Sequence, residues 1–169
     1  MKDLVALYIV KSIVGNNIII QQISAVFWYK DKFKFLTRYI KNEIKESWNA
    51  ITLEEALKIF APIIENKKII LKNDNGYDLG LLKKYYKDFF NKTFDNFVYD
   101  VSKTATELNF KKTSLEFLAK KYNTKISSNS NFPISVTRAQ NLFLIAIKMF
   151  GLNSKQNKNN DYISHQDNE

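Results

Sequence analysis

The stretch from Ile69 to Leu82, IILKNDNGYDLGLL, decides the fold class. Its first three residues, Ile69 to Leu71, are apolar and typical of a short buried strand. The run from Asn73 to Gly76 has the composition of a turn. Apolar side chains then repeat at helical spacing from Tyr77 to Phe90. A strand, a turn and a helix in this order predict an α/β domain.

The chain before this stretch predicts an antiparallel sheet. Leu4 to Val10 and Ile18 to Trp28 are apolar and β-branched, and the turn signal Gly15 to Asn17 separates them. Phe33 to Tyr39 alternates with period two, as a strand with one buried face does. We therefore expect a β-hairpin followed by a third antiparallel strand.

Capping signals mark two of the helices. Thr52, with Glu55 three residues later, forms a capping-box signature before an amphipathic segment, and Thr113 with Glu116 repeats it. The remaining elements that the pattern predicts are a short strand over Phe97–Tyr99, a brief helix over Val101–Leu108 and a final helix from about Ser135 to Phe150.

Composition predicts one domain with a polar tail. The chain has 169 residues, of which 45% are hydrophobic, and this is enough to bury one core. Residues 1–152 are expected to form the domain, and residues 153–169 are too polar to fold alone. The sequence has no cysteine, no apolar run long enough to span a bilayer and no signal-like start, so we expect a cytoplasmic protein without membrane contact.

The formal net charge of +9 has two interpretations. One is a polyanionic partner such as nucleic acid, and the other is an AT-rich coding bias that leaves a solvated surface of lysines. Arg38 and Arg138 are the only arginines. Because arginine is the usual residue for binding phosphate through two hydrogen bonds, this scarcity weakens the first interpretation. Composition alone leaves both open.

Four segments resemble the DnaQ-like (DEDD) 3′-to-5′ exonuclease family. Asn73–Leu82 is similar to the family's His-Asn-x-x-Phe-Asp motif, and Ile20–Val26 is similar to its second strand. Val98–Val101 and Ser114–Tyr122 resemble two segments that carry no chemistry. The resemblance covers roughly residues 1–150. It implies an α/β, RNase H-like fold, with a mixed sheet of three antiparallel strands followed by shorter parallel strands, flanked by helices.

Most of the residues that this family's chemistry needs are replaced. The aspartate and glutamate of its first motif fall on Tyr8 and Val10, and the histidine and aspartate of its third motif fall on Pro133 and Arg138. Asp78 is therefore the only motif acid left. We predict that Tyr8 and Val10 are ordinary packing residues of a strand.

The missing acids bear on the metal chemistry that the resemblance implies. Hydrolysis in this family uses two divalent ions held by carboxylates. Asp78 alone could hold one magnesium ion weakly and cannot organise two. The sole histidine, His165, lies in the polar tail, so no general base is evident near the site. No resident cofactor is expected, and Mg²⁺ or Mn²⁺ would be needed only if the chain is active.

Basic residues near these motifs have two candidate roles. Lys11, Lys72 and Arg138 could contact the phosphates of a nucleic acid. Alternatively, Arg138 could replace the metal and pair with Asp78. An unpaired charge in a partly buried site is costly, which favours the ion pair.

Three functions remain open from the sequence. The first is a catalytically inactive exonuclease-like domain that binds nucleic acid or serves a DNA replication or repair assembly. The second is an active metal-dependent 3′-to-5′ exonuclease whose acids come from positions such as Asp3, Asp74 or Asp100. The third is a protein-interaction scaffold that does not bind nucleic acid.

Overall fold

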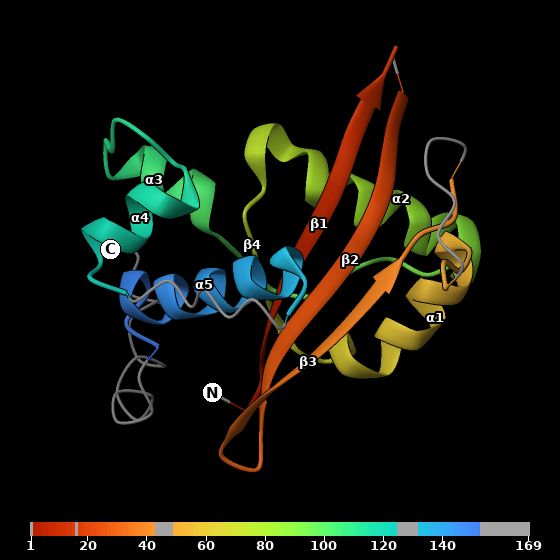
Figure 1. Ribbon diagram of the computed structural model, residues 1–169, viewed down its shortest axis with the longest axis horizontal. Coiled ribbons are helices and arrows are strands. Elements are labelled where there is room, and N and C mark those ends of the chain that lie inside the picture. Colours follow the sequence, from red (N-terminus) through yellow and green to blue (C-terminus); the bar gives the residue numbers. More distant parts are fainter. Residues whose placement is uncertain (1, 16, 43–48, 125–131, 153–169) are drawn as a thin grey trace, which may run out of the picture.

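A five-stranded mixed sheet forms the centre of the molecule. In the computed structural model, which describes residues 2–15, 17–42, 49–124 and 132–152, the strand order is β3-β2-β1-β4-β5 (Figure 1). The first three strands are antiparallel, and the last two run parallel to β1. The strands are β1 (Leu4–Val14), β2 (Asn17–Tyr29), β3 (Lys32–Tyr39), β4 (Lys68–Leu71) and β5 (Val98–Asp100).

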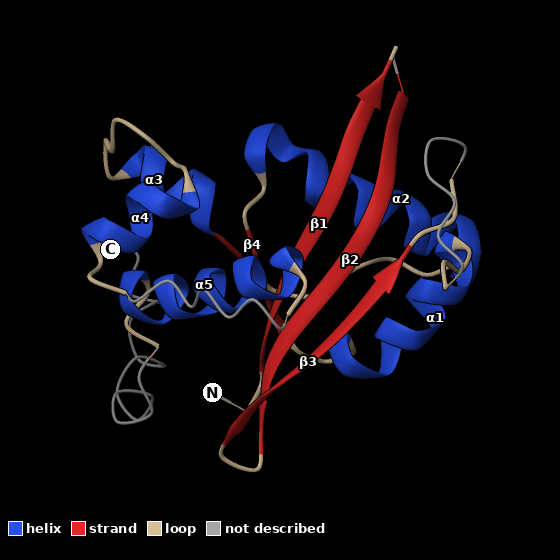
Figure 2. Cartoon of the chain, in the orientation of Figure 1, coloured by secondary structure: helices blue, strands red, loops and turns tan. Residues whose placement is uncertain are grey.

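Helices cover both faces of the sheet, which gives three layers (Figures 1 and 2). One face packs against α1 and α2, and the other packs against α3, α4 and α5. A single 3₁₀ turn, η1 (Asp74–Gly76), leads from β4 into α2. The helices are α1 (Leu53–Ile64), α2 (Tyr77–Phe90), α3 (Val101–Glu107), α4 (Leu115–Lys121) and α5 (Ile134–Met149).

Strand β1 contributes to both hydrophobic cores because its side chains alternate between the two faces. Val5 and Leu7 pack with α1 and α2, whereas Leu4 and Ala6 pack with α4 and α5. This explains why its sequence is continuously apolar from Leu4 to Val10, as in strands that are buried on both faces.

The β1–β2 pairing contains an irregularity that the sequence pattern did not predict. Val10 pairs with Gln22 and Lys11 pairs with Ile20, so β2 has one extra residue at this point. Such a β-bulge changes the alternation of the strand that carries it. As a result, Ile20 and Ile23 both face the core beneath α1 and α2. Beyond the bulge, β1 continues to Val14, four residues past the predicted end.

The predicted capping box of α1 is confirmed, and the predicted cap of α4 is shifted by one residue. Thr52 Oγ1 accepts a hydrogen bond from the Glu55 backbone N–H at 3.2 Å, and Glu55 Oε2 accepts one from the Thr52 N–H at 2.9 Å. For α4 the N-cap is Ser114, which accepts from the Phe117 N–H at 3.2 Å, and not Thr113. Thr113 and Ser114 both carry a hydroxyl, so composition alone does not tell which of them caps.

The predicted domain bounds, residues 1–152, remain a prediction. Leu152, the last described residue, is 9% exposed and packs in the core with α4 and α5. The predicted polar tail, residues 153–169, lies outside the described residues. Within the described ranges, no helix combines the length and hydropathy that crossing a bilayer would require.

Candidate functional site

A crevice lies beyond the carboxyl ends of β4 and β5. In this sheet, β2 and β3 lie on one side of β1, and β4 and β5 lie on the other. β1 pairs with β4 only as far as Ala6 and Ile70 and then continues past that edge. Leu71 pairs with Asp100, so β5 ends at the same edge. Ligand sites of open α/β sheets commonly lie at such a point. A cleft of about 840 Å³ opens here, lined by residues of η1 and α3 and by Ser114.

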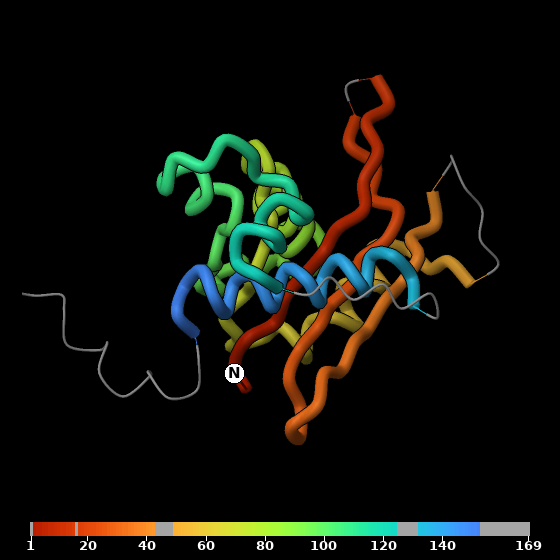
Figure 3. Tube along the Cα trace, turned by 60° about the vertical axis from the view of Figure 1, so that its left-hand side comes forward, coloured from red at the N-terminus to blue at the C-terminus, as the bar shows by residue number. Residues whose placement is uncertain are grey.

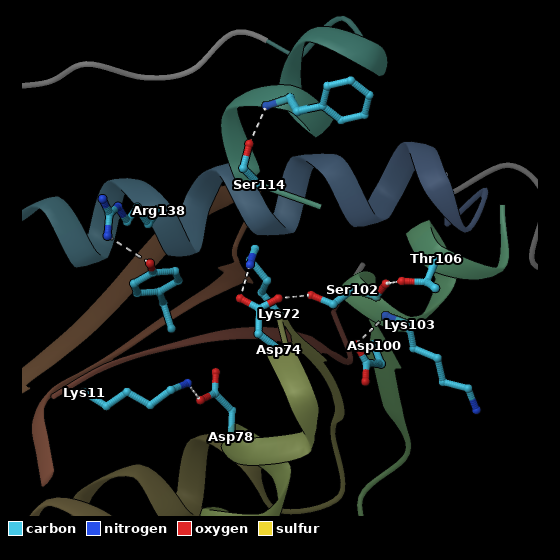
Figure 4. Close-up of polar contacts among 12 residues, drawn as sticks. Lys11, Lys72, Asp74, Asp78, Asp100, Ser102, Lys103, Thr106, Ser114 and Arg138 are labelled. Carbon is cyan, nitrogen blue, oxygen red and sulfur yellow. Dashed lines mark hydrogen bonds and ion pairs between the residues drawn. The ribbon is translucent and has the colours of Figure 1, made fainter. Parts of the chain in front are cut away.

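Asp78 lies beside this edge, in the first turn of α2, and is 5% exposed. The ammonium of Lys11, on β1, donates to its Oδ1 and forms an ion pair (Figure 4). Lys11 lies on the face of β1 that packs against α1 and α2, which brings it to the start of α2. The carboxylate is therefore already matched by a positive charge from the same chain.

Burial raises the pKa of the Asp78 carboxyl above its ordinary value. The hydrogen bond and the charge of Lys11 act in the opposite direction, and Lys72 adds a smaller lowering effect. The nearby Asp74 raises the pKa further. The pKa of Asp78 is raised overall, because the effect of desolvation outweighs that of the ion pair.

Arg138 lies on the other side of β1. Its Nη1 donates to the Tyr8 hydroxyl at 3.0 Å, and its Cζ lies 5.6 Å from the centroid of the Tyr8 ring (Figure 4). Tyr8 faces α5, because it is an odd number of residues from Lys11 along the strand. The predicted ion pair between Arg138 and Asp78 is wrong, since β1 separates the two side chains. The contact with Arg138 gives Tyr8 a polar partner that its strand pattern did not indicate.

Lys72, the third predicted phosphate contact, also has an acidic partner. Its ammonium pairs with Asp74 Oδ2, in η1. Ser102, in the first turn of α3, donates to Asp74 Oδ1 at 2.7 Å. These three residues join β4, η1 and α3 in one polar cluster on the wall of the cleft (Figure 4).

Asn73, which the sequence pattern indicates only as a turn residue, connects the ends of β4 and β5. Its Nδ2 donates to Asp100 Oδ2 at 2.9 Å, and its Oδ1 accepts from the Leu79 N–H at 3.0 Å. Asp100 Oδ1 also caps α3 by accepting from the Lys103 N–H at 3.0 Å. An asparagine two residues after an apolar strand was the available signal, but its partner lies 27 residues away in the sequence.

The two other replaced motif positions carry no polar side chain. Val10 is half-buried on β1 beside the bulge. Pro133 precedes α5, and its carbonyl accepts from the Val136 N–H at 2.9 Å. Both residues therefore have structural positions, and neither offers a group that could bind a metal or a phosphate.

The acids at this edge do not fit a two-metal centre. Asp78, Asp74 and Asp100 each accept hydrogen bonds from groups of the chain. Among the described residues, no three histidine, cysteine, aspartate or glutamate side chains converge in a way that could hold a metal ion. The donor set thus differs from the arrangement that the exonuclease resemblance implies.

Comparisons with known proteins find similarity to solved structures and none to known sequences. No protein-family model and no curated protein matches the sequence. A solved structure described as "Structure of yeast NOT1 MIF4G domain co-crystallized with CAF1" is similar, with a TM-score of 0.54 and 12% sequence identity. The similarity covers 89% of this chain and 79% of that chain. At this identity it bears on the fold alone.

This similarity corrects the fold class predicted from the sequence. The matched structure is described by its MIF4G domain and by CAF1, and its description does not name an RNase H-like fold. The fold is mixed α/β, with three antiparallel strands followed by two parallel strands, and the predicted RNase H-like class is wrong. Strand–turn–helix segments occur in many α/β proteins, so they predicted the elements but could not fix the narrower class.

Proposed function

We propose that this chain is a catalytically inactive, exonuclease-like domain that binds nucleic acid. The ion pair between Lys11 and Asp78 carries the proposal. A divalent cation at Asp78 would have to displace the ammonium of Lys11, which is also positively charged. The side chain of Asp78 is 8% exposed and that of Lys11 is 22% exposed, so water screens this pair only weakly.

The other acids support the same proposal. Asp74 is held by Lys72 and Ser102, and Asp100 caps α3. Asp3 lies beside Lys67 before β4, at the opposite end of these strands. Recruiting these acids as metal ligands would break contacts that position β4, η1 and α3, which disfavours the active-exonuclease alternative.

Arg138 is the cation best suited to contact a phosphate. Its partner is a neutral phenol, whereas Lys11 and Lys72 are matched by carboxylates. A guanidinium has five N–H donors, and one of them contacts Tyr8, so others remain for a phosphate oxygen. The net charge of +9 adds a long-range attraction for a polyanion.

Fluorescence anisotropy with labelled single-stranded oligonucleotides tests this function. We expect binding at low salt that weakens as salt rises. Arg138→Gln should weaken binding by about tenfold and reduce the salt slope by about one. Arg38→Gln is the matched control, because Arg38 is the other arginine and contacts the Thr37 carbonyl on β3. Equal losses in the two variants, or no binding at low salt, would contradict the proposal.

Incubation of labelled DNA and RNA with Mg²⁺ or Mn²⁺ tests the absence of catalysis. We expect no shortening of either substrate. Degradation that disappears in Asp78→Ala would establish the active-exonuclease alternative instead. Degradation that persists in Asp78→Ala would indicate a contaminating nuclease.

A protein-interaction scaffold is the second candidate. The similar structure is described as a domain crystallised with another protein, and this favours the idea of a protein partner. A member of a replication or repair assembly would fit a chain that also attracts nucleic acid. Failure to bind oligonucleotides at any salt concentration would favour the scaffold over the nucleic-acid proposal.

A further inference from the structure

The β1–β2 hairpin extends past the rest of the sheet as a two-stranded ribbon (Figure 3). We define the ribbon as Lys11–Val14 with Asn17–Ile20. β4 last pairs with β1 at Ala6, and β3 last pairs with β2 at Gln22. Within the described part of the chain, the ribbon strands therefore pair only with each other. Two-stranded ribbons are at best marginally stable alone in water, so additional pairing would stabilise this one.

Apolar side chains of the ribbon face solvent. Ile13 is 69% exposed and Val14 is 48% exposed. Ile13 pairs across the ribbon with Ile18, and Ser12 pairs with Ile19, so both faces carry an isoleucine of β2. Natural proteins commonly protect open strand edges with charged residues or proline. Asn17, Ile18, Ile19 and Ile20, on the outer edge of β2, include neither.

The ribbon carries a single charge, that of Lys11, on a strongly basic chain. From Leu4 to Tyr29 the sequence has no aspartate, glutamate or arginine, and its single lysine is Lys11. Lys11 is paired with Asp78. A polyanion would therefore gain little from this surface. Two copies with a net charge of +9 repel each other in general, and the ribbon, whose single charge is paired, is where they can approach.

We propose that two copies of this chain associate through their ribbons. The segment Asn17–Ile20 of one copy adds antiparallel to the same segment of the other, and Ile18 and Ile19, which are half-buried in the single chain, pack across the junction. A strand edge is complementary to its own copy when a two-fold axis relates the two. The free edge of β1 is less suitable, because Lys11 on this strand is held in the ion pair with Asp78 of α2. This inference is independent of the proposed function.

Sedimentation velocity of the full chain over a wide concentration range tests the association. The wild type is expected to show a monomer–dimer equilibrium. Ile13→Lys should raise its dissociation constant by about tenfold or more, because Ile13 lies opposite Ile18 and each copy would place an unpaired charge beside the apolar junction. Ile59→Lys, at an exposed position on α1, is the matched control and should leave the equilibrium unchanged. A wild type that stays monomeric, or equal effects of the two variants, overturns the proposal.

Hydrogen exchange locates the contact directly. The amides of Asn17 to Ile20 should become more protected as concentration rises in the wild type and not in Ile13→Lys. Protection elsewhere without protection of these amides would place the contact on another surface and overturn the proposal. Loss of oligonucleotide binding in Ile13→Lys, together with a monomeric wild type, would assign the ribbon to nucleic acid instead.

Discussion

The two faces of β1 hold a cation in different ways. On the face toward α2, Lys11 is paired with the buried carboxylate of Asp78. On the face toward α5, Arg138 lies over the ring of Tyr8 and donates to its hydroxyl. The first arrangement neutralises charge, and the second orients a charge without neutralising it. In the proposed function, the cation on the face toward α5 is therefore the one available to a phosphate.

Removing the cation on the face of β1 toward α2 should have the largest effect on stability. Lys11→Met leaves Asp78 buried without a counter-charge, which should lower the free energy of unfolding by about 3–5 kcal/mol. Urea denaturation followed by circular dichroism measures this loss. The double variant Lys11→Met with Asp78→Leu should recover most of it, because no unpaired charge remains. A loss below about 1 kcal/mol in the single variant would mean that the pair is loosely held.

The pH dependence of stability sharpens the comparison further. Because burial raises the pKa of Asp78, the folded state binds more protons there than the unfolded state just above the ordinary value of 3.8. The wild type should therefore lose stability relative to Asp78→Asn as pH rises through this window, and the difference should level off at higher pH. Unfolding in urea at a series of acidic pH values measures it.

Lys11→Met provides the control for this pH effect. Without the ammonium, the pKa of Asp78 should rise further, so the window of declining stability should extend to higher pH. An unchanged window in this variant would show that Lys11 does not interact with the carboxyl in solution.

A substitution on the face of β1 toward α5 should have a smaller effect on stability. Tyr8→Phe removes the hydroxyl that accepts from Arg138 but keeps the ring beneath the guanidinium. We expect a loss of about 0.5–1.5 kcal/mol in the free energy of unfolding and a smaller loss in oligonucleotide affinity than Arg138→Gln gives. Thermal unfolding and anisotropy measure the two effects. Loss of affinity equal to that of Arg138→Gln would assign the binding role to the Tyr8 hydroxyl.

Local patterns in the sequence predicted the elements better than their partners. The strand, turn and helix of Ile69 to Phe90 and the cap at Thr52 depend on neighbours within a few residues, and they formed as expected. The partner of Arg138 depends on which helices cover each face of β1. That is decided by the whole topology and not by spacing near Arg138.

Local sequence patterns also could not predict the contacts between residues of the site that are distant in the sequence. The link between Asn73 and Asp100 forms only when β4 and β5 are paired. The register changes between Val10 and Lys11, and β1 continues to Val14, past the strand end predicted at Val10. The prediction of the narrower fold class was wrong for a related reason. Motif-like segments indicate individual helices and strands, and they do not determine how these elements are assembled.

A Mn²⁺ titration followed by NMR tests most directly whether Lys11 has replaced a metal at Asp78. Paramagnetic Mn²⁺ broadens the signals of residues close to where it binds. We predict that the amide signals of Asp78 and Lys11 broaden no more than those of residues beside exposed carboxylates such as Glu54, whose side chain is 46% exposed. Selective, saturable broadening at Asp78 in the wild type would contradict the account, because it would show that a divalent ion displaces the ammonium.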